Sequence, residues 1–460
     1  MRKKSYGVFI LIISIVLLIS CSAEKSNKTE EKSDIVEITI ARFMKSADEN
    51  SIKSFNDYLK KEGIPYRVKF IQYMEADEEG FITNYEPGTY MDLVERDIDK
   101  IDLFVTNNSF ESDFDYLDMV KKNLAEPLDD FIKGEGIDIY NSIPKESWDS
   151  IKINEKLYSI PMYLGYDPTK GNMYYGIKKS YADKYNIDIS EWGADFWNHK
   201  EELNRIIEGE KDNELFSLFN PGLFSSITEL YPGYTPVTSS RSDINPYVYD
   251  EEQGKVINIY ESEPIKEIDS YFRELYNRNE ISFVYNPSEE ENILELFGDG
   301  EGYYIKEAET YLRKDTIYDI AISRESKNKE AVYDFLNLIY TDKNVLLAIE
   351  ECFGNPGIII GNGFCDSHIF NNDDINIVKE RYSKLNKSDI YGFVFDNSKV
   401  EKEMKDISIY LYERNRNIKG PTITDTDLNK DIEKLHELGI DKVLYEMNVQ
   451  IEEFKNKSTE

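Results

Sequence analysis

The feature that most constrains the fold is a strand–helix–strand pattern within residues 36–71. Residues 36–41 alternate between apolar and polar, which is strand periodicity. Apolar residues between 52 and 59 then recur at helical spacing, Gly63 follows where a helix would end, and residues 66–71 alternate again. Strand–helix–strand units build parallel sheets, so the chain is predicted to adopt an α/β fold.

A short apolar strand is also predicted at residues 101–105, and the polar turn after it contains Asn107 and Asn108. In open α/β sheets, ligands bind beyond the carboxyl ends of the strands. An asparagine side chain offers both a donor and an acceptor, which matches the dual character of a hydroxyl group. Asn107 and Asn108 are therefore candidate ligand-binding residues; the alternative is that they only form a turn.

A crossing between two lobes is predicted at residues 161–166. Pro161 has no backbone donor and should interrupt any central strand, and a new strand is expected at residues 174–177. Tyr163 and Tyr166 would then lie at a cleft between the lobes, which is the usual place for a small-molecule site.

Two further tyrosines are candidates for ligand binding. Tyr231 falls within residues 219–254, which are rich in Pro, Gly, Ser and Tyr and are expected to be irregular. Tyr303 falls within the glycine-rich residues 298–304, which lack the lysine and hydroxyl residue of a phosphate-binding loop. Tyrosine has a flat apolar face and a polar tip, which suits stacking on a sugar ring. The 34 tyrosines and 23 phenylalanines are equally explained by compositional bias, so their number alone indicates no ligand.

The C-terminal part of the chain is predicted to be helical. A strand from residue 317 leads into a helix with apolar residues on one face between 331 and 339. After residue 400, three apolar stripes at helical spacing predict further helices whose stripes face the core.

The N-terminus has the pattern of an export signal. Basic residues at 2–4 precede an apolar run at 8–19, which is too short to span a bilayer comfortably. Residues 18–21, Leu-Ile-Ser-Cys, resemble the bacterial lipobox, which implies cleavage of residues 1–20 and a lipid on Cys21. The alternative is an ordinary secretory signal in which Cys21 is incidental.

The next segment, residues 21–35, is polar and charged and is predicted to be a flexible tether. An anchor followed by a tether predicts a domain held at the extracellular face of the cell membrane by the lipid.

Composition argues against several functions. The formal net charge of −34 would repel phosphate backbones, so nucleic acid is not expected as a partner. The three histidines are scattered, and neither an activated nucleophile nor a carboxylate pair stands out. The sequence therefore predicts no enzyme, metal or cofactor. Cys352 and Cys365 could form a disulfide in an exported chain, or both could stay reduced.

Several segments, in this order, resemble the extracellular solute-binding lipoproteins of bacterial carbohydrate-type ABC importers (family 1-like substrate-binding proteins). One similarity is to the family's crossing between lobes, another to a helix that begins Ser-Lys-Asn, and the last to a C-terminal extension in one branch. These segments are residues 156–161, 320–342, 391–396 and 438–450. Residues 350–357 depart from the pattern of that branch.

The resemblance implies a two-lobed periplasmic-binding-protein-like fold, with lobes connected by a hinge and a helical C-terminal region. Lobe one would contain residues 36–160 with 317–361, and lobe two residues 161–316 with 362–457. It further implies a monomer that captures a carbohydrate, an oligosaccharide, between its lobes and delivers it to ABC transporter permease subunits. The alternatives are a binding protein for peptide or another polar solute, and a surface glycan hydrolase or adhesin.

Overall fold

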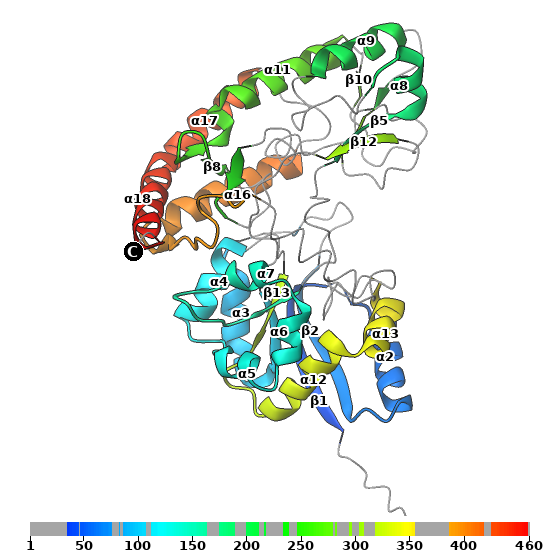
Figure 1. The fold of residues 1–460 in the computed structure, drawn as a ribbon. Helices are drawn as coiled ribbons and strands as arrows, with labels where there is room; N and C mark the ends of the chain where they lie inside the picture. Colours follow the sequence, from blue (N-terminus) through cyan, green and yellow to red (C-terminus); the bar gives the residue numbers. More distant parts are fainter. Residues whose placement is uncertain are drawn as a thin grey trace, which may run out of the picture.

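The computed structural model describes residues 35–458 except 46, 76–81, 83–85, 107–111, 163–173, 189–198, 211–215, 218–232, 239–245, 279–280, 283–293, 297–302, 308–317, 355–385 and 418–424. Figure 1 shows two lobes, with the longest C-terminal helices along one side of the upper lobe.

Five strands form the sheet of the lower lobe, in the order β2-β1-β3-β13-β4. β1 runs parallel to β2 and β3, whereas β13 runs antiparallel to β3 and β4. The strands are β1 (Val36–Met44), β2 (Tyr66–Met74), β3 (Leu103–Thr106), β4 (Ile160–Met162) and β13 (Tyr318–Ile322). The predicted strands and the α/β architecture are confirmed.

Pro161 lies inside β4 rather than interrupting the strand. β4 is at the edge of the sheet, where its one neighbour is β13. A proline is tolerated in an edge strand because its missing N–H can face away from the neighbouring strand. Residues 161 and 162 of the expected crossing therefore belong to the lower sheet, and residues 163–166 lie outside the described residues.

Helices cover the lower sheet. Asp48 caps α2 by accepting hydrogen bonds from the backbone N–H groups of Asn50 and Ser51, and Gly63 after the helix has a φ of 71°. α2 packs against β2 and α13, and α12 packs against α6 and α13. The helices are α2 (Glu49–Lys61), α3 (Thr89–Asp97), α4 (Ser112–Lys121), α5 (Asp129–Lys133), α6 (Ile137–Ser142), α7 (Lys145–Asp149), α12 (Lys329–Thr341) and α13 (Lys343–Phe353).

The upper lobe contains smaller sheets. β5 (Tyr174–Lys178) lies between β11 (Leu294–Leu296) and β12 (Tyr303–Glu307), and β6 (Phe216–Ser217) pairs with β10 (Ile281–Ser282). A third sheet consists of β7 (Tyr234–Pro236), β8 (Tyr247–Asp250) and β9 (Lys255–Asn258). The helical elements of this lobe are α8 (Lys179–Tyr185), α9 (Lys200–Glu210), η5 (Ile259–Glu261) and α11 (Glu263–Asn277).

The expectation that residues 219–254 are irregular is wrong in part, because β7 and β8 lie within them. Tyr247, Val248 and Tyr249 of β8 are all buried. A strand that is buried on both faces lacks the alternation by which strands are recognised in a sequence.

The C-terminal helices are α16 (Glu401–Asn417), α17 (Asp425–Glu437) and α18 (Ile440–Ser458), preceded by the 3-10 turn η7 (Asn397–Lys399). The predicted apolar stripes are confirmed: Val400, Met404, Ile407 and Leu411 are buried, as are Val443, Met447 and Ile451. None of the helices formed by described residues is both long and apolar enough to cross a membrane. The residue boundaries assigned to the two lobes remain a prediction.

Asp102 joins the two parts of the chain that meet in the lower sheet. This buried carboxylate accepts hydrogen bonds from the backbone N–H of Thr39 in β1 (3.0 Å) and from Ser326 Oγ after β13 (2.6 Å). Its backbone carbonyl accepts from Ser323 N–H (2.9 Å). One residue therefore connects β1 to the segment that returns much later in the chain.

Asp102→Ala should lower the free energy of unfolding by about 1–3 kcal/mol, because it leaves buried donors without an acceptor. Chemical denaturation measures this change. Asp99→Ala is the matched control, because Asp99 also precedes β3 in the sequence but its side chain is exposed. An equal effect of the two substitutions would contradict the role given to Asp102.

Candidate functional site

The candidate site lies at one edge of the lower sheet. β1, β2, β3 and β4 all end at this edge, and β13 begins there, as their parallel and antiparallel pairings require. The chain leaves the sheet after β4 and returns to it at β13, so these two connections to the upper lobe start from the same edge, and a third follows α13 (Figure 1). The carboxyl edge of such a sheet is where α/β proteins bind ligands.

Two polar residues face each other across the strands at this edge. Thr106 is the last residue of β3 and Asp319 is the second residue of β13, and the two are direct partners in the register. Directly opposed residues of antiparallel strands have their side chains on the same face. Both residues are completely buried, and the hydroxyl of Thr106 has no hydrogen-bond partner in the described part of the chain.

Tyr116 of α4 contributes a third polar group. Its hydroxyl donates to the carbonyl of Ile151 and accepts from Ser159 Oγ at 3.4 Å. Complete burial, with the negative charge of Asp319 as a further cause, raises the pKa of Tyr116 well above its usual value. Tyr116 therefore stays neutral and keeps its proton at any physiological pH.

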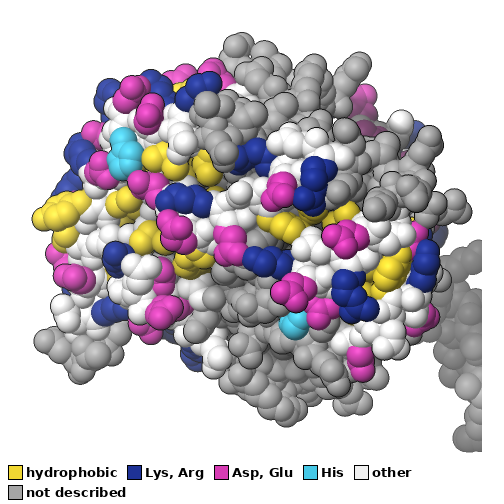
Figure 2. All heavy atoms as spheres, turned by 90° about the horizontal axis from the view of Figure 1, so that it is seen from above, with side chains coloured by type: hydrophobic (Ala, Val, Ile, Leu, Met, Phe, Trp, Pro, Cys, Tyr) yellow, Lys and Arg dark blue, Asp and Glu magenta, His cyan; other side chains and the backbone are white. Residues whose placement is uncertain are grey.

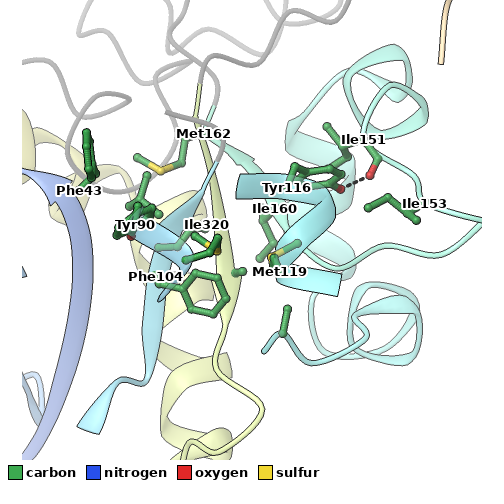
Figure 3. Close-up of a cluster of buried hydrophobic side chains, with 14 of the residues drawn as sticks. Phe43, Tyr90, Phe104, Tyr116, Met119, Ile151, Ile153, Ile160, Met162 and Ile320 are labelled. Atoms are coloured by element: carbon green, nitrogen blue, oxygen red, sulfur yellow. Dashed lines mark hydrogen bonds between the residues drawn. The ribbon is translucent and has the colours of Figure 1, made fainter. Parts of the chain in front are cut away.

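The core beneath this edge is apolar and partly aromatic. Figure 3 shows Phe43, Tyr90 and Met162 close to one another at one end of the buried cluster, and the Tyr116–Ile151 hydrogen bond at the side. The rings of Phe43 and Tyr90 meet edge to face, 5.6 Å apart. Small-molecule sites typically combine apolar walls with a few placed polar groups.

The crossing at β4 is held by a helix of the same lobe. Tyr340 of α12 is buried, and its hydroxyl donates to the carbonyl of Pro161 at 3.2 Å. Pro161 has no backbone N–H to donate, so its carbonyl makes the bond that holds β4 to α12. The arrangement suits a strand from which the chain leaves one lobe.

Of the predicted ligand residues, Asn107, Asn108, Tyr163, Tyr166 and Tyr231 lie outside the described residues, as does Cys21. Tyr303 is the first residue of β12, where it pairs with Lys178 of β5. The structure brings none of these side chains together within its described ranges, and all six ligand residues remain predictions.

The predicted disulfide is also untested. Cys352 lies in α13, is half-buried and forms no disulfide with a described residue, whereas Cys365 is outside the described ranges. Burial raises the pKa of the Cys352 thiol. Within the residues that the structure covers, no group of three His, Cys, Asp or Glu side chains is placed to hold a metal ion.

Sequence analysis did not identify Thr106, Asp319 or Tyr116. A signal existed for Asp319, which is the one acidic residue in the strand Tyr-Asp-Ile-Ala-Ile of β13. Buried acidic residues are rare unless they have a partner or a role. The position of Thr106 opposite Asp319 depends on the register of two distant strands, which the sequence does not reveal.

The C-terminal region matches a family model described as a domain of unknown function (DUF3502), over residues 389–456. Across a larger part of the chain, the protein is 24% identical over 405 residues to a carbohydrate ABC transporter substrate-binding protein of Streptococcus pneumoniae. That match covers 74% of this chain and 78% of the relative.

Solved structures resemble nearly the whole chain. The N-glycan transport solute binding protein NgtS of S. pneumoniae has a TM-score of 0.63 at 19% identity, covering 92% of this chain and 99% of NgtS. The S. pneumoniae ABC-transporter substrate binding protein FusA, in complex with kestose, has a TM-score of 0.57 at 13% identity, covering 92% of this chain and 100% of FusA. The chain has their two-lobed periplasmic-binding-protein-like fold, which confirms the predicted fold class.

Thr106→Val should leave the free energy of unfolding unchanged or raise it by up to about 2 kcal/mol, because it removes a buried hydroxyl that bonds to no described residue. Thr235→Val is the matched control: Thr235 is also buried in a strand, but its hydroxyl donates to Glu251 at 2.6 Å. The control should lower the free energy of unfolding by about 1–2 kcal/mol. Equal losses in denaturant titrations would show that the Thr106 hydroxyl is already bonded.

Proposed function

We propose that this protein is a lipid-anchored extracellular substrate-binding protein that captures an oligosaccharide between its two lobes and delivers it to the permease of an ABC transporter. The observation that carries the proposal is a fold shared, over more than nine-tenths of the chain, with NgtS and FusA, both of which are solute-binding proteins. NgtS has been solved in complex with Man1GlcNAc and Man5GlcNAc, and FusA with kestose.

The geometry of the lower lobe supports binding at its carboxyl edge. The connections after β4 and before β13 leave from this edge, so a hinge there would let the lobes enclose a ligand. The predicted turn with Asn107 and Asn108 directly follows Thr106 at the end of β3. Amide groups would bond sugar hydroxyls, and Tyr163, Tyr166, Tyr231 and Tyr303 would stack on sugar rings.

The anchoring part of the proposal rests on the N-terminal sequence. The lipobox-like residues 18–21 and the polar residues 22–35 would hold the folded domain near the membrane surface. Metabolic labelling with a fatty acid tests this, since the wild-type chain should carry the label and the Cys21→Ser chain should not. Labelling of both chains would contradict an anchor at Cys21.

An oligosaccharide that binds the native state should raise the midpoint of thermal unfolding. At one hundred times its dissociation constant, a ligand stabilises by about 2.7 kcal/mol. The panel should contain Man1GlcNAc, Man5GlcNAc and kestose, with short peptides and polyols for comparison. A saturable rise with an oligosaccharide is expected, whereas a rise with peptides alone would overturn the substrate class.

Tyr303→Ala should weaken oligosaccharide binding by about tenfold through loss of a stacking face, as measured by titration calorimetry. Tyr304→Ala is the matched control, because neighbouring residues of a strand point to opposite faces and both belong to β12. The control should leave the affinity within about twofold. A larger loss with Tyr304→Ala would place the ligand on the other face of β12.

A further inference from the structure

The C-terminal unit, residues 389–458, is joined firmly to the upper lobe. α18 packs along β9 and α17 packs against η5. Asn448 of α18 binds the backbone of Val256 in β9 twice: its Oδ1 accepts from the N–H at 2.8 Å, and its Nδ2 donates to the carbonyl at 3.1 Å. A side chain that satisfies both backbone groups of an edge-strand residue takes the place of a neighbouring strand. This contact therefore fixes both where α18 lies along β9 and how far it is from β9.

Charged groups extend the same attachment. Lys455 of α18 donates to the hydroxyl of Tyr249 in β8 and, within the unit, to Asp389 at 2.9 Å. His436 of α17 lies between Asp441 (2.8 Å) and Glu261 of η5 (3.1 Å), and these two hydrogen bonds raise its pKa. Figure 2 shows acidic and basic side chains interspersed over the face seen from above.

The contacts between this unit and the lower lobe are of a different kind. Lys121, at the end of α4, lies 3.0 Å from the carboxylate of Asp396, and it donates to Ser398 Oγ at 2.8 Å and Asn397 Oδ1 at 3.2 Å. Burial opposes ionisation of Asp396, but the hydrogen bonds from Ser398 and the ammonium group of Lys121 lower its pKa on balance. The contact is thus charged on both sides and about one-third exposed at Lys121.

Two tyrosines of the unit also reach the lower lobe. The hydroxyl of Tyr391 donates to the carbonyl of Glu146 in α7. The hydroxyl of Tyr412 in α16 donates to the carbonyl of Ile82 at 3.3 Å and accepts from its N–H. On this side the Lys121–Asp396 ion pair is partly exposed, whereas the Tyr412 hydroxyl is buried and binds both backbone groups of Ile82.

The C-terminal unit is thus attached differently to the two lobes, and this difference determines which set of contacts breaks when the lobes rotate. A rotation of the upper lobe against the lower lobe would change the distance between α4 and a body fixed to β9. A partly exposed ion pair such as Lys121–Asp396 breaks at small cost, whereas the packed faces of α17 and α18 do not separate as easily.

We infer that the C-terminal unit moves with the upper lobe as one body, and that the contacts of Lys121 hold it against the lower lobe. These contacts of Lys121 are called the latch. The inference gives a role to the domain of unknown function: it sets the equilibrium between arrangements of the two lobes. It depends on the proposed function only in that such a rotation would accompany ligand capture. Lys121 would thus affect the relative positions of the lobes without contacting the ligand.

Double electron–electron resonance on the full chain in detergent micelles tests the latch without any carbohydrate. Spin labels at positions 133 and 208, both exposed and on the lower and upper lobes, report the distance between lobes. Ketone-bearing residues at these positions carry the labels, so the native cysteines stay unchanged. Lys121→Ala should reduce the population of the wild-type distance, relative to other distances, by about two- to fivefold.

Lys122→Ala is the matched control, because the neighbouring Lys122 pairs with Asp92 and Glu95 of α3, inside the lower lobe. Its distance distribution should match that of the wild type. The exchanged pair Lys121→Asp with Asp396→Lys should restore the wild-type distance, which a general loss of folding would not allow. An unchanged distribution for Lys121→Ala, or an equal change for Lys122→Ala, would overturn the latch. Because no glycan is present, either result leaves the proposed function standing.

Discussion

The structure depends on the pairing of β13 with β3 and β4. These strands come from distant parts of the chain, yet their registers align at one edge of the lower sheet. The pairing completes the sheet and at the same time brings two of the connections to the upper lobe, after β4 and before β13, to that edge. Asp102 reinforces it, because the same carboxylate binds β1 and the segment that follows β13. The proposed ligand site between the lobes would therefore follow from how the lower sheet is assembled.

The pairing also explains why polar residues collect within an apolar layer. Thr106 and Asp319 are opposed because β3 ends where β13 begins. The negative charge of Asp319 also contributes to the raised pKa of Tyr116. Buried polar groups are costly unless they are hydrogen-bonded, so such a group at a crossing calls for a structural or functional reason. The C-terminal unit adds a further connection between the lobes, since it contacts both β9 and α4.

Much of the fold could be predicted because its elements have strong periodicity. The strand–helix–strand start and the C-terminal stripes bury one face each, and that pattern is visible in the sequence. The sequence does not predict β8 because it is buried on both faces, and it does not predict β4 because Pro161 argues against a central strand but is acceptable in an edge strand. The pairs Thr106–Asp319 and Lys121–Asp396 join residues far apart in the chain, and residue type alone does not predict such contacts.

The central claim is that the protein binds an oligosaccharide and releases it intact. Equilibrium dialysis of the full chain against the oligosaccharides that raise its thermal midpoint, followed by mass spectrometry of the recovered glycan, tests this most directly. The account predicts retention of one glycan per protein chain, with a mass unchanged after release. Recovery of shorter products would show hydrolysis and contradict the account, as would retention of several glycans per chain without saturation.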